Sequence, residues 1–337
     1  MQPKLKRSEL DHFAKFYSLN DAGVESMLAA AEARPSRIEG LQFLSACLRI
    51  AGVVSLAAGL VFFVAANWSR FAVFGRFALV EAVLLGCGVL AFLRPPPNYL
   101  GRGALFLAFV ATGALLALFG QTYQTGADVY ELFFTWSLLG LPLAMLAQWS
   151  LVSAAWVVVL NTALLLYCGW QPAGGLLWTL LGEQTLRPAY LVLMACWLNL
   201  ALWLLAEWRE PPAVPQWVRR LLVSSAFAFC SWAGLQALFA HEPYPSTREG
   251  EPGAVLLVLL TLAAVSAYAY RRRSDIYPLA VTLGTFIVVG LGGVIRIFEN
   301  ADKGLFLLGA LWLIGTSTVG GRLLLALIRR WREEARA

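Results

Sequence analysis

Apolar residues along this chain are gathered into long blocks, which short polar stretches separate. Each block is about as long as the roughly 20 residues that a helix needs to cross a hydrocarbon core of about 30 Å. This pattern predicts an all-α fold, a polytopic transmembrane helix bundle with about ten spans. The blocks lie near residues 43–66, 73–93, 104–120, 131–148, 151–168, 189–207, 220–240, 254–270, 276–297 and 304–328. Only Gln148, Trp149 and Ser150 separate the fourth block from the fifth, which predicts a tight helical hairpin.

The chain before the first block is polar. Residues 1–42 are predicted to form a short cytoplasmic helical segment, ahead of a transmembrane domain at 43–337. The apolar residues of 10–17 are spaced for one helical face, and Asn20 or Asp21 is placed to cap a second short helix. No apolar core of a cleavable signal peptide precedes the first span. Insertion is therefore expected to begin with that span itself.

The distribution of basic residues indicates the orientation. If the N-terminus is cytoplasmic, eighteen of the 26 Lys and Arg residues fall on the inner side and four in outer loops, and four lie inside or at the ends of spans. Basic loops favour the cytoplasmic side of a membrane. We therefore expect both termini in the cytoplasm, because one missed or additional span would invert the later loops and spoil this agreement.

Composition supports lipid as the main solvent of the chain. Hydrophobic residues make up 59% of the 337 residues and charged residues only 14%, against about a quarter in soluble domains. The net charge of +6 does not point to nucleic acid, because the basic residues sit mostly in short loops between apolar blocks. The lipid bilayer is thus an expected partner, and nucleic acid is not.

The five cysteines and two histidines form no ligand pattern. All the cysteines lie within or at the ends of apolar blocks, without a CxxC pair, where cysteine acts as a small buried hydrophobe. Neither His12 nor His241 belongs to a cluster. We therefore expect no metal site and no cofactor.

Two stretches are open to more than one interpretation. The segment 169–188 opens on a Pro and Gly break and continues with mixed apolar spacing, which favours a short interfacial helix on the outer face over a re-entrant segment. In the ninth block, the glycines at 290, 292 and 293 favour close helix contact. The alternative is an unwound stretch at 289–293 that lines a substrate cavity.

Glu81 is the sharpest candidate for a functional residue. It follows Arg76 by five residues in the second span and so lies about 7 Å deeper, at a rise of about 1.5 Å per residue. An ionisable residue at such a depth is costly unless it is paired, protonated or facing water, and it is a functional hypothesis by default. The alternative is a structural ion pair, in which Arg76 or Arg296 neutralises Glu81 and locks helices together.

Further polar candidates are expected on the same outer side. Asn67 closes the first span, and the polar loop 121–131 follows the third. The loop places amide, hydroxyl, phenol and carboxylate groups around glycines that permit tight turns, and these groups suit sugars, peptides or headgroups. The alternative is a polar connector in which Thr125 or Asp128 caps the fourth span. The predicted binding set is Asn67, Arg76, Glu81, Gln121, Tyr123, Gln124, Thr125, Asp128 and Arg296.

Three motifs stand in the first half of the chain: Ala-Ala-Asn-Trp at 65–68, Gly-Gln-Thr-Tyr-Gln-Thr-Gly-Ala-Asp at 120–128, and Leu-Phe-Phe-Thr-Trp at 132–136. This combination resembles a bacterial family of predicted membrane proteins of unknown function. The resemblance covers residues 1 to about 170. It implies a location in the bacterial inner membrane and supplies no activity. Some relatives are associated with a second membrane protein, so the resemblance also implies such a partner.

The sequence leaves three functional hypotheses. No P-loop, HExxH, GxSxG or Asp-rich nucleotide-sugar motif is present, which argues against an ATP-driven pump or a zinc protease. The first hypothesis is a carrier or binding protein for a small polar or lipid-linked molecule at the outer face. The alternative is a non-catalytic membrane scaffold or partner subunit of a membrane complex. An outer-leaflet transferase ranks third because no nucleophile and base can be named, so the sequence favours a protein that is not an enzyme without settling the point.

Overall fold

The computed structural model describes residues 16–20, 23–24, 26–27, 37–66, 72–123, 126, 128–169, 189–208, 214–239, 251–272, 275–298 and 304–334. Within these ranges the chain forms ten α-helices and no strand. The helices are α3 (Arg37–Ala66), α4 (Val73–Leu93), α5 (Tyr99–Tyr123), α6 (Val129–Ala147), α7 (Ser150–Tyr167), α9 (Ala189–Trp208), α10 (Gln216–Phe239), α11 (Pro252–Arg272), α12 (Tyr277–Ile297) and α13 (Gly304–Glu334). Each contains a stretch long and apolar enough to cross a membrane, which confirms the predicted all-α fold with about ten spans.

The chain forms two compact units, Met1–Ala72 and Val73–Ala337. In the first unit, the side-chain oxygen of Asn20 accepts a hydrogen bond from the backbone N–H of Gly23 at 2.9 Å, as expected of a helix cap. Helix α3 runs without interruption across the domain boundary predicted between residues 42 and 43. The interfacial or re-entrant segment predicted for 169–188 lies, apart from its first residue, outside the described ranges.

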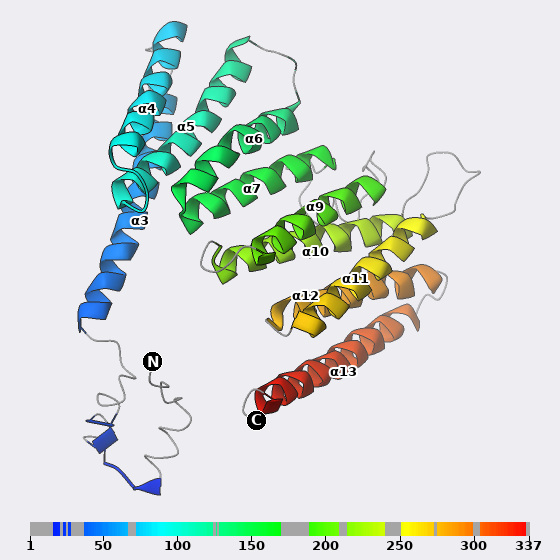
Figure 1. Ribbon diagram of the computed structural model, residues 1–337. Helices are drawn as coiled ribbons and strands as arrows, with labels where there is room; N and C mark the ends of the chain where they lie inside the picture. Colours follow the sequence, from blue (N-terminus) through cyan, green and yellow to red (C-terminus); the bar gives the residue numbers. More distant parts are fainter. Residues whose placement is uncertain are drawn as a thin grey trace. The chain divides into compact units, whose positions relative to one another are not determined.

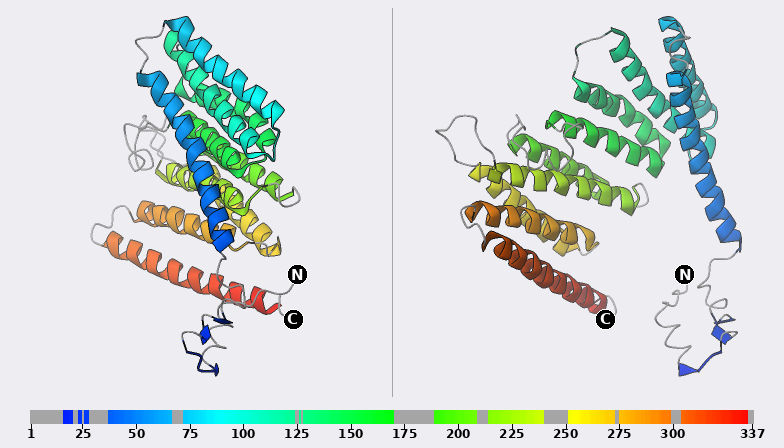
Figure 2. Two further views of the ribbon diagram at one scale, coloured as in Figure 1. Left: turned by 90° about the vertical axis from the view of Figure 1, so that its left-hand side faces the viewer. Right: turned by 180° about the vertical axis from the view of Figure 1, so that it is seen from behind.

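In the second unit, most helices pack on their neighbours along the chain (Figures 1 and 2). Helix α4 contacts α5, α5 contacts α6, and α6 contacts α7. Helix α7 then meets α10, which also packs on α9, α11 and α12, and α12 packs on α13. Helix α10 therefore connects the two groups of helices within this unit.

The main apolar core of the second unit lies where α7, α9, α10, α11 and α12 meet. Leu193, Val223 and Phe227 are among its fully buried side chains. The buried Ala226 and Ala233 on α10 let the neighbouring backbones approach closely. In a lipid environment, where burial against solvent gives little gain, such close packing is a main source of helix association.

A reciprocal amide pair joins α7 to α9 inside this core. Asn161 and Asn199 donate to each other's side-chain oxygens at 3.1 and 3.0 Å. Each also donates to the carbonyl four residues before it, Val157 for Asn161 and Ala195 for Asn199. Asn199 is fully buried, so these bonds satisfy an amide that would otherwise be costly in an apolar interior.

Tryptophans connect other helix pairs through backbone carbonyls. The indole N–H of Trp136 on α6 donates to the carbonyl oxygen of Phe109 on α5 at 2.8 Å. Gly113, one turn further along α5, lies under the same indole, and a Cβ there would overlap the ring. The same arrangement recurs between α12 and α13 at Ile287, Gly290 and Trp312.

Helix α12 is continuous from Tyr277 to Ile297, so the alternative of an unwound stretch at 289–293 is wrong. Its glycines accommodate neighbours instead. Gly290 lies against Trp312 of α13, and Gly292 lies against Leu235 of α10. Close helix contact, the preferred interpretation, therefore explains both positions.

The tight hairpin predicted between the fourth and fifth spans is present. Helix α6 ends at Ala147, Gln148 adopts a left-handed backbone conformation with φ 45°, and α7 begins at Ser150. Two residues thus reverse the chain and bring α6 and α7 into contact.

Candidate functional site

Glu81 lies near the middle of α4. Eight residues precede it in the helix and twelve follow, so it is about 12 Å from one end and about 18 Å from the other. Its side chain is exposed and makes no hydrogen bond or ion pair with any described residue of the second unit. The structural pair predicted with Arg76 or Arg296 is therefore absent.

Glu81 belongs to a row of exposed residues along one face of α4, spaced three or four apart. We call this row the α4 stripe; it consists of Phe74, Ala78, Glu81, Leu85, Val89 and Phe92. Leu85 is 70% exposed and Phe92 86% exposed. The other face of the helix carries Val83 and Cys87, which pack against Ala104 and Ala108 of α5. Helix α4 thus has one buried face and one open apolar face with a single carboxylate.

The start of α4 and the end of α5 meet, as the predicted site requires. The ring of Tyr123 lies 6.1 Å from that of Phe77 on α4 and 4.8 Å from that of Phe119 on α5. Arg76 directly precedes Phe77 in the helix. The structure therefore brings the predicted residues Arg76 and Tyr123 to the same end of the bundle.

Gln121 and Asp128 flank the same loop, and both side chains are exposed. Asp128 is the N-cap residue of α6, but its side chain makes no capping hydrogen bond, so the predicted cap by its carboxylate is not formed. Gly126 has φ +68°, the left-handed conformation that glycine allows at a turn. The carboxylate of Asp128 is therefore exposed and is not used to cap the helix.

Three predicted residues, Asn67, Gln124 and Thr125, lie outside the described ranges. Arg296 is in the last turn of α12, a helix that packs on α10, α11 and α13. Helix α4 packs on α5 instead. The structure therefore does not bring Arg296 to Glu81, and the predicted set divides between two groups of helices.

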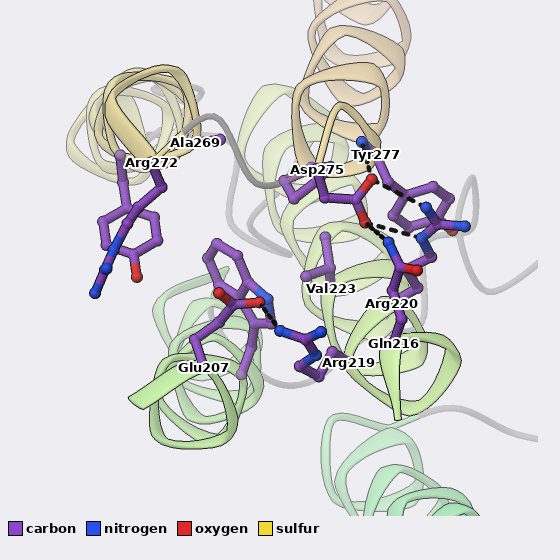
Figure 3. A pocket seen from close by; sticks show the side chains of 12 residues that line it. Glu207, Gln216, Arg219, Arg220, Val223, Ala269, Arg272, Asp275 and Tyr277 are labelled. Atoms are coloured by element: carbon purple, nitrogen blue, oxygen red, sulfur yellow. Dashed lines mark hydrogen bonds and ion pairs between the residues drawn. The ribbon is translucent and has the colours of Figure 1, made fainter. Parts of the chain in front are cut away.

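A second polar cluster, which sequence reasoning did not identify, surrounds a cavity of about 40 Å³ in the second unit. We call it the arginine cavity (Figure 3). It lies where α9 and α11 end and where α10 and α12 begin. Its lining consists of Trp203, Glu207, Gln216, Arg219, Arg220, Val223, Tyr268, Ala269, Arg272, Asp275, Tyr277 and Pro278.

Asp275 is held on one side of this cavity by several donors. Arg220 binds both of its oxygens, at 2.9 and 3.0 Å, and Gln216 and the backbone N–H of Tyr277 each donate at 3.1 Å. Burial alone raises the pKa of Asp275, but the hydrogen bonds and the charge of Arg220 outweigh it and lower that pKa below its usual value. Asp275 is therefore ionised at neutral pH.

The other side of the cavity holds a second ion pair, between Arg219 and Glu207 at 2.6 Å. Arg272 comes from α11 and lies over the ring of Tyr268, 5.9 Å from its centre. All three arginines line the cavity. In Figure 3, Arg219 points toward Glu207 and Arg220 toward Asp275, whereas Arg272 lies on the opposite side with its guanidinium group turned away from theirs. The arrangement can bind an anion, and its described lining residues include no nucleophile paired with a base.

The arginine cavity was missed because its arginines were used only to orient the chain in the membrane. The acidic residues next to these arginines could have indicated the cavity. Glu207 and Asp275 stand at the ends of spans, beside runs of basic residues, where a carboxylate is needed neither for insertion nor for topology.

Ten helices of this length and hydropathy define the chain as a multi-pass α-helical membrane protein. Residues 17–153 match the family model described as a predicted membrane protein (DUF2157), a family of unknown function, which confirms the resemblance inferred from the sequence motifs. Nothing matches among curated proteins or solved structures. No group of three or more His, Cys, Asp or Glu side chains in the described ranges is placed to hold a metal ion.

Proposed function

We propose that this chain is a non-catalytic subunit of a membrane complex and that the α4 stripe is its contact with a second membrane protein. The observation that carries the proposal is Glu81, an exposed carboxylate near the middle of a span that has no partner among the described residues of its own unit. A charged group at the centre of a span costs about 2.5–3.5 kcal/mol on insertion scales. A counter-charge on a neighbouring helix offsets this cost.

The proposed partner has a defined chemistry. It presents a membrane-spanning helix with an Arg or Lys near its midpoint, because only that residue reaches Glu81 at the same depth. Leu85 and Phe92 pack against the apolar residues of that helix, and Ala78 allows the two backbones to approach. The complex is proposed to lie in the bacterial inner membrane, which the family resemblance and the distribution of basic residues support.

A photo-crosslinking amino acid at position 85, in cells that make the full chain, tests the contact. We expect a crosslinked peptide from another protein, and its sequence should be a membrane span with a central Arg or Lys. Glu81→Gln should abolish this crosslink, and Glu131→Gln, the same change at the start of α6, should leave it intact. Exchange of the two charges between the partners should restore it.

Three results would contradict the subunit role. They are crosslinks only to lipid or to the same chain, a partner span without a basic residue, or an unchanged crosslink in Glu81→Gln. Each would show that the carboxylate does not hold a second protein.

The carrier or binding-protein role at the outer face is the second candidate. Arg76, Gln121, Tyr123 and Asp128 lie at the same end of α4–α6, and the last three are exposed, which supports this role. The test is the thermal stability of the purified full chain with a panel of sugars, short peptides and lipid headgroups. A compound that raises the melting temperature, with the rise lost in Tyr123→Ala, would favour this role; no rise with any member would argue against it.

A further inference from the structure

The arginine cavity carries a surplus of positive charge. Two of its three guanidinium groups are neutralised by ion pairs, one with Asp275 and one with Glu207. The third, on Arg272, contacts the ring of Tyr268 and forms no ion pair with a carboxylate in the described ranges. Counted over the described residues, the lining thus has one more positive than negative charge.

Two buried polar atoms beside this charge, Nε of Arg219 and the phenol oxygen of Tyr268, have no hydrogen-bond partner among the residues that the structure describes. A buried polar atom without a partner loses its hydrogen bonds to water and gains none in return, so such atoms point to a group that a bound molecule supplies. Arg219 and Arg272 can only donate hydrogen bonds, and the phenol of Tyr268 can also donate. Three donors around one surplus charge select a negatively charged acceptor.

The size and accessibility of the cavity restrict this acceptor. A water molecule needs about 10–15 Å³ by the same measure, so 40 Å³ holds about three waters or one compact anionic group. Gln216 and Arg272 are exposed at its edge, so the cavity can be reached from outside. A small anionic group therefore fits, while the remainder of a larger molecule stays outside.

The cavity also lies at the level of a membrane surface. It is formed by the ends of four spans, and the exposed Trp208 and Trp217 mark the same level at the end of α9 and the start of α10. Tryptophan is enriched at the boundary between lipid and water. Basic pockets between spanning helices at this boundary are suited to acidic lipid headgroups.

We infer that the arginine cavity binds the phosphodiester group of an anionic phospholipid, with Arg272, Tyr268 and Arg219 as hydrogen-bond donors. A phosphodiester carries a single negative charge, which balances the surplus charge of the lining. The acyl chains lie along the apolar flanks of the helices, and the phosphate occupies the cavity. This site is separate from the α4 stripe and does not depend on the proposed subunit role.

The test uses the full chain in detergent and measures binding of short-chain phosphatidylglycerol by native mass spectrometry. Arg272→Gln should weaken binding about tenfold, which corresponds to about 1.4 kcal/mol. The matched control is Arg271→Gln, which removes an adjacent charge that does not line the cavity and should change binding less than about twofold. Tyr268→Phe removes only a hydroxyl group without a partner, so it should weaken binding and leave the fold intact.

Two further ligands separate the possible sources of the phosphate. Diacylglycerol with the same chains should bind weakly, and inorganic phosphate should not displace the lipid at millimolar concentration. If phosphate displaced the lipid, the cavity would still be an anion site, but its ligand would be free phosphate and not a phospholipid. Equal binding of diacylglycerol, or equal losses in Arg272→Gln and Arg271→Gln, would overturn the inference.

Discussion

At the scale of single residues, the polar side chains of the spans divide by how they are satisfied. Asn161 and Asn199 satisfy each other inside the core. Glu81 is exposed and has no hydrogen-bond or ion-pair partner in the described part of its unit. The amide pair joins two helices of the fold, whereas the carboxylate of Glu81 can still bind a group from another molecule. This contrast is why we assign a binding role to the carboxylate and a structural role to the amides.

The amide pair makes a stability prediction. Asn199→Ala should lower the free energy of unfolding by about 1–3 kcal/mol, because it leaves the amide of Asn161 buried with fewer bonds. The double variant with Asn161→Ala should lose less than the sum of the two single variants, by about 0.5–2 kcal/mol. Unfolding in SDS measures all three. Thr162→Ala is the control, because the hydroxyl group of this partly exposed residue bonds to Val158 within α7. Strictly additive losses in the double variant would contradict an interaction between the two amides.

Asp275 makes a prediction about pH. Its folded-state pKa is lower than its value in the unfolded chain, so the ion pair with Arg220 contributes stability that is present above about pH 4 and is lost as pH falls through the folded pKa. The contribution is about 1 kcal/mol, because Arg220 is 43% exposed and solvent screens the pair. Melting temperatures in nanodiscs between pH 7 and pH 3 should fall less in Asp275→Asn than in the wild type. If the melting temperatures of the variant and the wild type fell equally with pH, the carboxyl group of Asp275 would not contribute to this pH dependence.

Glu81 could be identified from the sequence alone, because a single charged residue within an apolar block is recognisable without knowledge of the fold. Sequence reasoning could not identify the pair of Arg220 and Asp275, because 55 residues separate them and only the packing of α10 and α12 brings them together. Nor could it tell that Glu81 and Arg296 lie apart, because α4 packs on α5 whereas α12 packs on α10, α11 and α13. Contact between residues on different spans depends on which helices are neighbours, and hydropathy does not determine that.

At the scale of elements, the blocks of apolar residues predicted the helices closely. The second span was placed at 73–93, the bounds of α4. Differences arise mainly where polar residues extend a helix beyond the apolar block, as in α5, which begins at Tyr99, and α13, which continues to Glu334. The length of an apolar block measures the part of a helix in lipid, and polar turns add to it at either end.

The contact between α5 and α6 makes a prediction about glycine. Gly113→Ala should lower the free energy of unfolding by about 1–3 kcal/mol, because the added methyl group displaces the indole of Trp136 and weakens its bond to Phe109. Gly120→Ala is the matched control on the same helix, since a Cβ there meets nothing within 4 Å. It should be neutral or stabilising by up to about 1 kcal/mol, because alanine favours helix. Equal effects of the two substitutions in SDS unfolding would argue against the contact.

At the scale of the whole molecule, the orientation predicted from the basic loops, with both termini in the cytoplasm, can be tested directly. A fluorescent protein fused after Ala337 should fold and fluoresce in the cytoplasm. Alkaline phosphatase inserted at Gly126 should be active in the periplasm, and the same enzyme inserted at Pro95 should be inactive. The reverse pattern would contradict the assigned orientation and would move the arginine cavity to the outer leaflet.

The family match and the main core fall on different parts of the chain. Residues 17–153 include α3 to α6 and the first turn of α7, whereas the main core is built from α7 and α9 to α12. The α4 stripe lies within the matched part and the arginine cavity outside it. The proposed partner contact therefore concerns what this chain has in common with the family, and the lipid site concerns the remainder.

The amide pair between α7 and α9 also has a consequence for biosynthesis. Asn161 leaves the ribosome 38 residues before Asn199, which takes about 2–8 s at roughly 5–20 residues per second. During that interval the side chain of Asn161 lacks the two hydrogen bonds that Asn199 provides in the folded protein. We expect the segment that carries Asn161 to stay at the lateral gate of the translocon until the later one arrives, so that the two enter the bilayer together as a hairpin.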